Sequence, residues 1–344
     1  MFAMSDDRRI GAGRLAWVSQ ARYTGKSMTT NDEWDARAAE AVVTVIVPAY
    51  AVGAMIRDAM RSLQAQDFPS WVAVVVDDGD PAAAQYVVPL LTDTRFRFLR
   101  TDNGGLSLAR NRGMDEAVTP FVALLDGDDM LEPDFLSSLL AVFETSPAIG
   151  FVTCDATYFG EDRQGELFSS YCPQDLPPSL DAVLRRRFNV FSQTVMRREA
   201  IFGIGGFDVK LKASEDLDAW IRLLENGWEL GYVPRPLVRY RRHKGQTTRN
   251  VLAMLQTTLV VMQNARERLQ GRPEEATATE MCAHIEKEME VASAFELLHR
   301  GSVSAAIGEF DRIGVDMVSP RWRAVLRLLK IAPFLAGPLL KLRR

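Results

Sequence analysis

Four short apolar runs, separated by segments that mix polar and apolar residues, are the feature that most constrains the fold of this chain. The runs are residues 42–47, 71–76, 96–99 and 121–125. Short, continuous runs rich in β-branched residues are typical of strands buried on both faces, as in a parallel sheet. After the first run, apolar residues recur at helical spacing, namely Met55, Ile56, Ala59, Met60 and Leu63. The alternation predicts βαβ units, and therefore an α/β fold with a Rossmann-like, mostly parallel sheet flanked by helices.

Acidic residues follow two of these predicted strands. Asp77 and Asp78 end the second, and the segment Asp126-Gly127-Asp128-Asp129 follows the fourth. In open parallel sheets, ligands bind outside the carboxyl ends of the strands. Two acidic clusters at one edge would repel each other unless a cation or a set of hydrogen-bond donors lies between them. The sequence therefore predicts a ligand site at this edge.

The second half of the chain is less regular. Residues 150–158 and 189–196 are predicted strands, and Asp216–Asn226 is a predicted helix that Gly227 ends. Beyond about residue 250 the pattern is helical. The predicted division is a leader without an assigned role over 1–40, an α/β domain over 41–250, a helical extension over 251–320 and a basic tail over 321–344.

Composition excludes several classes of protein. The net charge of -4 gives no reason to expect nucleic-acid binding, and three scattered cysteines suggest neither a disulfide framework nor a metal site. Residues 1–40 contain no signal-peptide pattern, and no apolar stretch reaches the roughly 20 residues of a membrane-spanning helix. A cytoplasmic protein is expected. The chain also lacks a G-x-G-x-x-G fingerprint and a Walker-type lysine loop, which argues against dehydrogenases and P-loop enzymes.

Seven motifs occur in order between residues 42 and 248. They are Val45 to Tyr50, Val76 to Asp80, Asn103 to Gly113, Leu124 to Asp129, Gly205 to Asp208, Glu215 to Trp220 and Tyr240 to His243. Together they resemble family-2 glycosyltransferases of bacterial type, with the GT-A fold. The resemblance implies inverting transfer of a sugar from a nucleotide-diphosphate donor, a UDP-sugar above all, to an acceptor hydroxyl. The basic tail over 321–344 points to a glycan or lipid-linked acceptor. The resemblance also implies a role in the synthesis of a cell-surface polysaccharide or glycoconjugate.

A divalent cation is expected beside the fourth strand. Mn²⁺ or Mg²⁺, held by a carboxylate and by diphosphate oxygens, would neutralise the charge that grows on the leaving diphosphate. The resemblance implies that Asp128 binds the metal and that Asp126 contacts the ribose or supports the site, with Asp129 as an alternative ligand. His243 would be a further metal ligand or a phosphate contact; the alternative is a surface histidine in a basic loop.

The nucleotide base is expected beside the second strand. By resemblance, Asp78 accepts a hydrogen bond from the uracil ring, and Pro48 and Tyr50 line its pocket. The family usually has Asn where this chain has Ala51, which removes a hydrogen bond from the loop. Arg110 would pair with the base or the diphosphate, or else be a surface arginine on its helix.

The predicted chemistry is assigned to the Glu215-Asp216 pair. By resemblance, Asp216 is the general base that takes the proton of the acceptor hydroxyl, and Glu215 contacts sugar hydroxyls. Asp218 and Trp220 would shape the acceptor pocket, although Trp220 suits the core equally well.

The last stretch of the chain has seven basic residues and no acidic one. The basic residues are Arg321, Arg323, Arg327, Lys330, Lys341, Arg343 and Arg344, interleaved with Trp322 and many leucines. This pattern favours an anionic membrane surface, so peripheral attachment to the inner face of the cell membrane is predicted. The alternative is a terminal helix packed on the domain with its basic face in solvent.

Two other functions fit part of the pattern. A nucleotide-sugar-binding module without turnover would keep the fold, but the motifs that carry Asp128, Asp216 and His243 are all present. A sugar nucleotidyltransferase would also use carboxylates and a divalent ion. It normally needs a glycine-rich basic loop after the first strand, and Pro48-Ala49-Tyr50-Ala51 offers none.

Overall fold

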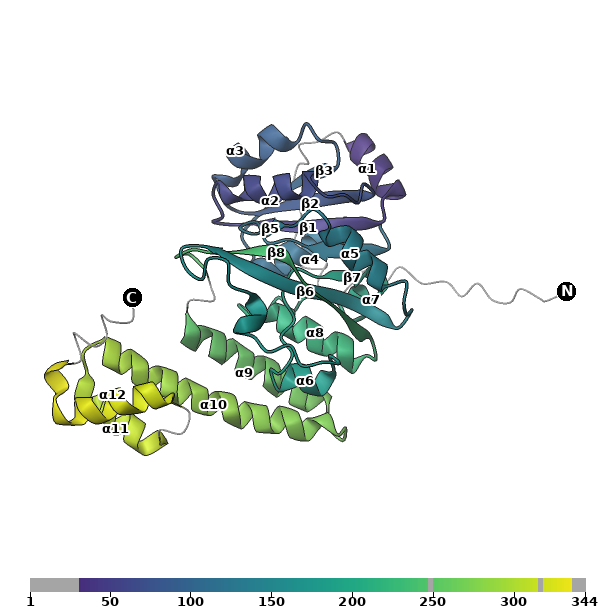
Figure 1. Ribbon diagram of the computed structural model, residues 1–344. Helices are drawn as coiled ribbons and strands as arrows, with labels where there is room; N and C mark the ends of the chain where they lie inside the picture. The colour runs from purple at the N-terminus through teal and green to yellow at the C-terminus, as the bar shows by residue number, and fades with distance from the viewer. Residues whose placement is uncertain (1–30, 247–249, 315–317, 336–344) are drawn as a thin grey trace.

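The structure is a computed structural model that describes residues 31–246, 250–314 and 318–335. One eight-stranded sheet has the strand order β3-β2-β1-β4-β7-β6-β8-β5 (Figure 1). The strands are β1 (Val43–Ala49), β2 (Trp71–Asp78), β3 (Phe96–Thr101), β4 (Phe121–Leu124), β5 (Met130–Leu131), β6 (Ile149–Gly160), β7 (Val195–Arg197) and β8 (Glu229–Arg242). The α-helices are α1 (Asn31–Glu40), α2 (Met55–Gln64), α3 (Ala83–Val87), α4 (Leu106–Asp115), α5 (Phe135–Val142), α6 (Leu180–Leu184), α7 (Arg198–Gly203), α8 (Glu215–Glu225), α9 (Val251–Arg268), α10 (Glu274–His299), α11 (Val303–Ile313) and α12 (Pro320–Ile331). Short 3-10 turns are η2 (Val88–Leu90), η3 (Phe168–Ser170) and η5 (Pro333–Leu335).

The first four strands are parallel and confirm the predicted α/β fold. β1 pairs with β2 on one side and with β4 on the other. The chain therefore runs outward from β1 to β3 and then returns to the opposite side of β1. Such a reversal is a topological switch point, where α/β proteins bind ligands at the carboxyl ends of the strands. Ala49, Asp78 and Asp126 all lie at or just beyond these ends.

Alternate residues of the strands feed two hydrophobic cores. In β2, Val72, Val74 and Val76 face one core, and Trp71, Ala73 and Val75 face the other. This period of two is expected because successive side chains of a strand point to opposite faces. Helices α2 and α5 cover one face, and α4, α8 and α9 contribute to the core on the other.

Strands β7 and β8, beyond β4 in the sheet, differ from the prediction. The predicted strand over 189–196 is short, because only Val195–Arg197 pairs as β7, antiparallel to β4 and β6. The 14-residue strand β8 was not predicted, since Pro234 and Pro236 interrupt its sequence. Proline cannot donate to a ladder and is confined to edges and irregularities. Here the pairing of β6 with β8 shifts register close to Pro236.

The helices after residue 250 fall into two groups. Residues of α9 and of the first half of α10, such as Val261, Met262 and Ile285, are buried in the same core as the sheet. The second half of α10 packs with α11 and α12 around two small clusters that include Phe310 and Leu329. Figure 1 shows this second group standing out at the lower left. Among the described helices, none is both long and apolar enough to cross a membrane.

Candidate active site

Arg110 joins carboxylates from two distant segments. Its guanidinium lies 2.8 Å from Asp126 Oδ1 and 2.7 Å from Glu215 Oε1, and only 1% of its side chain is exposed. Burial opposes the charged form of Arg110, but Asp126, Glu215 and the nearby Asp216 outweigh it and raise the pKa of the arginine. Arg110 is therefore a fixed buried cation and not the surface arginine that was one alternative.

Glu215 and Asp216 begin helix α8 beside this cation. Glu215 is buried, and burial raises its pKa from 4.5 to about 7, although Arg110 opposes the shift. Asp216 is partly buried, and burial raises its pKa as well, again against the effect of Arg110. Its Oδ1 accepts the N–H of Leu217 at 2.7 Å. A partly exposed carboxylate with a raised pKa is suited to accept a proton.

Asp128 lies against His243 at the same edge. The two side chains come from the loop after β4 and from the end of β8, and Asp128 Oδ2 is 2.9 Å from His243 Nε2. Desolvation raises the pKa of Asp128, Asp126 raises it further, and His243 lowers it. The structure thus brings together the two residues predicted to bind metal. No group of three or more His, Cys, Asp or Glu side chains that could hold a metal ion occurs among the described residues.

Asp129 is a structural tether. It is buried, and it accepts the backbone N–H of Arg241 at 2.8 Å and the amide of Gln193 at 2.7 Å. Arg241 completes the connection, because its guanidinium donates to the carbonyl of Asp128 at 2.7 Å and to Asp58 at 2.8 Å. These bonds fix β8 to the acidic loop, and they leave Asp129 poorly placed for its alternative role as a metal ligand.

Gly127 allows the acidic loop to approach β1 closely. A Cβ atom at this position would lie 2.7 Å from the carbonyl oxygen of Pro48 and 3.0 Å from Ile56 Cδ1. Backbone is not free to move aside as a flexible side chain would, so only glycine fits between Asp126 and Asp128. The predicted nucleotide residue Pro48 thus contacts this loop through its carbonyl.

At the end of β2, the carboxylate of Asp78 accepts its hydrogen bonds from a nearby loop. Both carboxylate oxygens of Asp78 accept backbone N–H groups, from Gly104 and Gly105, at 2.9 Å each. Asp78 is only 3% exposed, and burial raises its pKa against the effect of these bonds. Asp78 therefore holds the loop that begins α4, and its predicted contact with uracil must use the lone pairs that remain. Nearby, Tyr50 is 55% exposed and free to stack on a ring.

The loop that carries Tyr50 is strained at its next residue. Ala51 has φ 55°, a left-handed conformation that a residue other than glycine or asparagine rarely adopts. Its backbone N–H donates to Asp80 Oδ2 at 3.0 Å. Asp80 thus supplies a hydrogen bond to the loop in which the usual asparagine is missing.

Helix α4 also fixes the segment that leads to Glu215. The side chain of Asn111 donates to the carbonyl of Phe207 at 2.8 Å and accepts the N–H of Phe207 at 2.9 Å. Gly206, at φ 73°, would place a Cβ 2.7 Å from Asn111 Oδ1. Consecutive residues Arg110 and Asn111 therefore both reach across to the second half of the domain.

Two predicted acceptor residues lie elsewhere. Trp220 is 1% exposed and stacks on Phe151 with ring centroids 5.3 Å apart, so it belongs to the core. Asp218 is 2% exposed and pairs with Arg222 at 2.7 Å. Neither position fits contact with an acceptor, because both side chains are covered by protein.

Sequence reasoning missed two polar residues of the site. Ser192 Oγ donates to Asp126 Oδ2 at 3.1 Å, and Gln193 Nε2 lies 3.3 Å from the same oxygen. Both occur where a strand was predicted. The only available signal was that the polar sequence Ser192-Gln193-Thr194 interrupts this apolar run.

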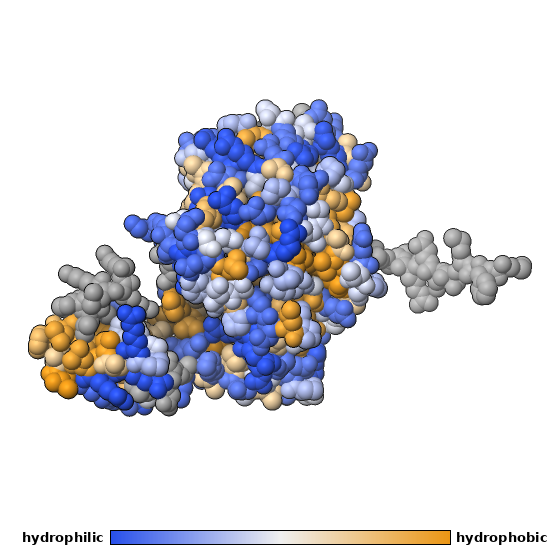
Figure 2. Space-filling model, viewed as in Figure 1, coloured by the Kyte–Doolittle hydropathy of each residue, from blue (hydrophilic) through white to orange (hydrophobic). Residues whose placement is uncertain are grey.

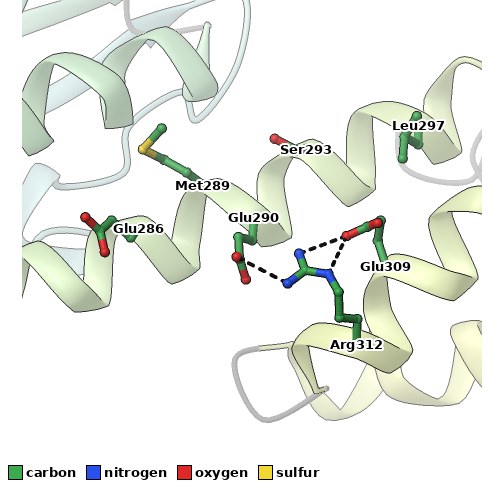
Figure 3. A pocket seen from close by; sticks show the side chains of 7 residues that line it. All are labelled: Glu286, Met289, Glu290, Ser293, Leu297, Glu309 and Arg312. Carbon is green, nitrogen blue, oxygen red and sulfur yellow. Dashed lines mark hydrogen bonds and ion pairs between the residues drawn. The ribbon is translucent and has the colours of Figure 1, made fainter.

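A separate cavity of about 410 Å³ lies between α10 and α11. Figure 3 shows Arg312 between Glu290 and Glu309, with Met289 and Leu297 on the wall. The arginine is 3.4 Å from Glu290 and 2.9 Å from Glu309, so its charge is matched locally. No predicted site residue lines this cavity.

The sheet with its switch point at β1 and β4, and the acidic residues gathered there, define a domain of the GT-A class. Solved structures agree. S. aureus TarS 1–349 in complex with UDP-GlcNAc matches with a TM-score of 0.58 and 19% identity, over 71% of each chain. The mannosyltransferase PcManGT of Pyrobaculum calidifontis, in complex with GDP-Man and Mn²⁺, matches with a TM-score of 0.57 and 19% identity, over 85% of this chain and 81% of that chain.

Residues 44–206 match the model of glycosyl transferase family 2, and this chain carries a family-2 glycosyltransferase domain. Similar curated proteins include EpsH of Bacillus subtilis, 25% identical over 58% of this chain, and the O-antigen biosynthesis protein RfbC of Myxococcus xanthus, 26% identical over 58%. The matched regions span 61% of EpsH and 16% of RfbC. Glu215, Asp216 and His243 lie beyond the matched residues 44–206.

Proposed function

We propose that this chain is an inverting glycosyltransferase that moves a sugar from a nucleoside-diphosphate donor, a UDP-sugar, to an acceptor hydroxyl. The observation that carries the proposal is the position of Arg110, which pairs with Asp126 at the end of β4 and with Glu215 at the start of α8. The buried guanidinium of Arg110 thus contacts both Asp126, predicted to bind the donor, and Glu215, predicted to bind a sugar hydroxyl.

Asp216 acts as the general base in this proposal. It draws the proton from the acceptor hydroxyl while that oxygen attacks the anomeric carbon on the face opposite the diphosphate, which inverts the configuration. Arg110 lowers the pKa of Asp216 and so offsets part of the rise that burial causes. Glu215, paired with Arg110, would bind a sugar hydroxyl with its remaining acceptor capacity.

Asp128 and His243 would hold the divalent cation together with diphosphate oxygens. The fit is supported by their chemistry: a carboxylate oxygen and an imidazole nitrogen lie 2.9 Å apart, and a donor set of this kind suits Mn²⁺ better than Mg²⁺. A bound cation would stabilise the negative charge of the departing diphosphate. Asp126, beside Ser192 and Gln193, would orient the ribose.

The donor and the turnover are tested in one screen. Release of the nucleoside diphosphate is measured for a panel of UDP- and GDP-sugars with Mn²⁺ or Mg²⁺, in parallel with pyrophosphate release from UTP and a sugar phosphate. Diphosphate release from UDP-sugars alone is expected. Pyrophosphate release would instead favour a nucleotidyltransferase, and tight donor binding without any release would favour an inactive binding module.

The cation site is tested by calorimetry of UDP binding. Asp128→Ala should lower UDP affinity in Mn²⁺ to the level measured without metal, because the variant lacks the carboxylate ligand. Glu144→Ala, on an exposed side chain after α5, is the matched control and should bind UDP normally. Equal metal dependence in Asp128→Ala and the unaltered protein would contradict the assignment.

We further propose that α12 and η5 attach the protein to an anionic lipid surface, where a lipid-linked or cell-surface glycan would be the acceptor. Leu328, Ile331 and Phe334 recur at intervals of three, and the last two are 85% and 81% exposed. Figure 2 shows apolar residues at this end of the molecule, at the lower left. Arg321, Arg327 and Lys330 are exposed on the same helix, and residues 336–344 of the predicted tail lie outside the described residues.

Membrane attachment is tested by sedimentation with vesicles. The full chain should co-sediment with vesicles of phosphatidylglycerol and phosphatidylcholine, and much less with phosphatidylcholine alone. Ile331→Ser with Phe334→Ser should abolish this binding, whereas Val118→Ser, at a residue 63% exposed far along the chain, should not. Unchanged binding of the double variant would rule out this surface.

A further inference from the structure

Ser214 has an unusual conformation directly before the predicted base. It occupies the N-cap position of α8 with φ 56° and ψ 21°, in the left-handed region, and its side chain makes no capping hydrogen bond to the helix. Residues in this region are held there by their surroundings and cluster at functional sites. Whatever fixes Ser214 also fixes the backbone that carries Glu215 and Asp216.

Helix α9 supplies the contacts that hold Ser214. The buried Ser214 hydroxyl lies 3.3 Å from the hydroxyl of Thr257 and 3.2 Å from that of Thr258. Both threonines can donate to carbonyls of their own helix, those of Ala253 and Met254. A hydroxyl has one hydrogen to donate, so each threonine then offers Ser214 an acceptor, and Ser214 donates its single hydrogen to one of the two threonines at a time.

The same helix holds α8 further along its length. Arg268 pairs with Glu225 at 2.7 Å and with Asp218 at 3.4 Å. Arg272, just beyond α9, donates to the carbonyl of Glu225 at 2.9 Å. Contacts therefore exist at the start, in the first turn and at the end of α8. A helix held in this way has little freedom to turn or slide. Of the contacts named here, those of Ser214 act on the residue next to Glu215-Asp216.

We propose that Thr257 and Thr258 are positioning residues for the reaction, which act through Ser214 to hold the Asp216 carboxylate toward the acceptor. The proposal rests on the assignment of Asp216 as the general base. It gives the helical region after residue 250 a direct part in turnover. Because the contact is on the acceptor side of the site, it affects turnover and leaves donor binding unchanged.

The test replaces both threonines by valine, which keeps their shape and removes the hydroxyls. For Thr257→Val with Thr258→Val, kcat is expected to fall by about 10- to 100-fold, since small misplacements of a reacting group cost that much. The donor KM and the affinity for UDP by calorimetry should stay within about twofold. Thr257→Ser with Thr258→Ser restores the hydroxyls and should recover most of kcat.

Two further variants separate positioning from folding. Thr279→Val is the matched control, because its exposed hydroxyl donates to the carbonyl of Glu275 in its own helix, and it should behave like the unaltered protein. Ser214→Gly adopts φ 56° without strain but lacks the hydroxyl, so it should fold normally and still lose kcat. If the valine variant does not fold, Ser214→Gly still tests the positioning role.

The outcomes distinguish the two levels of the proposal. Normal kcat in both the valine variant and Ser214→Gly overturns the positioning role. A parallel loss of kcat, UDP affinity and thermal stability also overturns it, since the hydroxyls would then serve only the fold. If Asp216→Asn keeps full activity, the base assignment has failed instead, whatever the threonine variants do.

Discussion

The acidic clusters at the ends of β2 and β4 look alike in sequence but are organised differently. Asp78 is satisfied by Gly104 and Gly105, about 25 residues away in the chain, and it shapes its own loop. Asp126 and Asp128 instead meet Arg110, Ser192 and His243 from separate parts of the domain. The difference shows that two similar carboxylate runs can be held in different ways. The backbone amides of a nearby loop hold Asp78, whereas side chains from distant segments hold Asp126 and Asp128.

The largest effect is expected at Asp216, which lies in the first turn of α8 near Arg110 and Asp126. Asp216→Asn should lower kcat by about 10²–10⁴-fold, because the amide cannot accept the proton. UDP affinity should change little, as measured by calorimetry. In the unaltered protein kcat should also fall at low pH, at a higher pH than for an ordinary aspartate, because burial raises the pKa of Asp216. Normal turnover by the variant would exclude this base.

Removal of the shared cation should affect stability and pH dependence together. Arg110→Met leaves the buried Glu215 without its counter-charge, which costs about 3–5 kcal/mol in the free energy of unfolding. Since Arg110 lowers the pKa of Glu215 and Asp216, the acid limb of kcat should move to higher pH. Denaturant unfolding and a pH profile measure both. An unshifted limb in a folded variant would show that Arg110 has only a structural role.

A smaller and different effect is expected at the β2 cluster. Asp78→Asn keeps one acceptor oxygen for two N–H groups, and losing one bond to a charged acceptor costs about 1.5–3 kcal/mol of stability. Donor KM should rise because the loop loosens, while the acid limb of kcat should stay where it is. Measuring Tm, and kcat as a function of pH, distinguishes the effect of a substitution at the β2 cluster from that of one at the β4 cluster. A shift of the acid limb in this variant would mean that both clusters belong to one titrating site.

The smallest effect is expected in the loop beside Tyr50. Ala51→Asn places a residue that tolerates the left-handed region at φ 55°, which should stabilise the protein by about 1 kcal/mol. Tm should rise by roughly 2–4 °C, as followed by circular dichroism, with kcat unchanged. Ala51→Val is the opposite control and should lower Tm. A lower Tm for the asparagine variant would mean that the loop is not strained there.

The parallel half of the fold could be predicted because its signals are local. The apolar runs of β1, β2 and β4 and the carboxylates that follow them are adjacent in sequence. Strand β8 could not be predicted, since Pro234 and Pro236 argue against a strand and its stability comes from pairing with β6. Pattern also predicted the helices after residue 250, but not that α9 shares the core of the sheet.

The acidic residues of the candidate site could be proposed from the sequence, whereas the side chains that contact them could not. The motifs supplied Asp126, Asp128, Glu215 and Asp216, but one sequence cannot reveal that Arg110 lies between two of them. Ser192, Gln193, Thr257 and Thr258 have no motif, and only the three-dimensional contacts identify them. For Trp220, the amphipathic spacing of α8 favoured the core, and the resemblance favoured the acceptor. The structure follows the spacing.

The shared packing of α9 and α10 bears on how this chain could be recombined with others. A cut at residue 250 would strip Val261, Met262 and Ile285 from the sheet and expose an apolar face. Between Ile285 and Ala294, by contrast, α10 passes from one cluster of buried residues to the next. A chimera that exchanges the end with α11 and α12 should therefore be spliced within that stretch of α10, where each half keeps its own buried cluster.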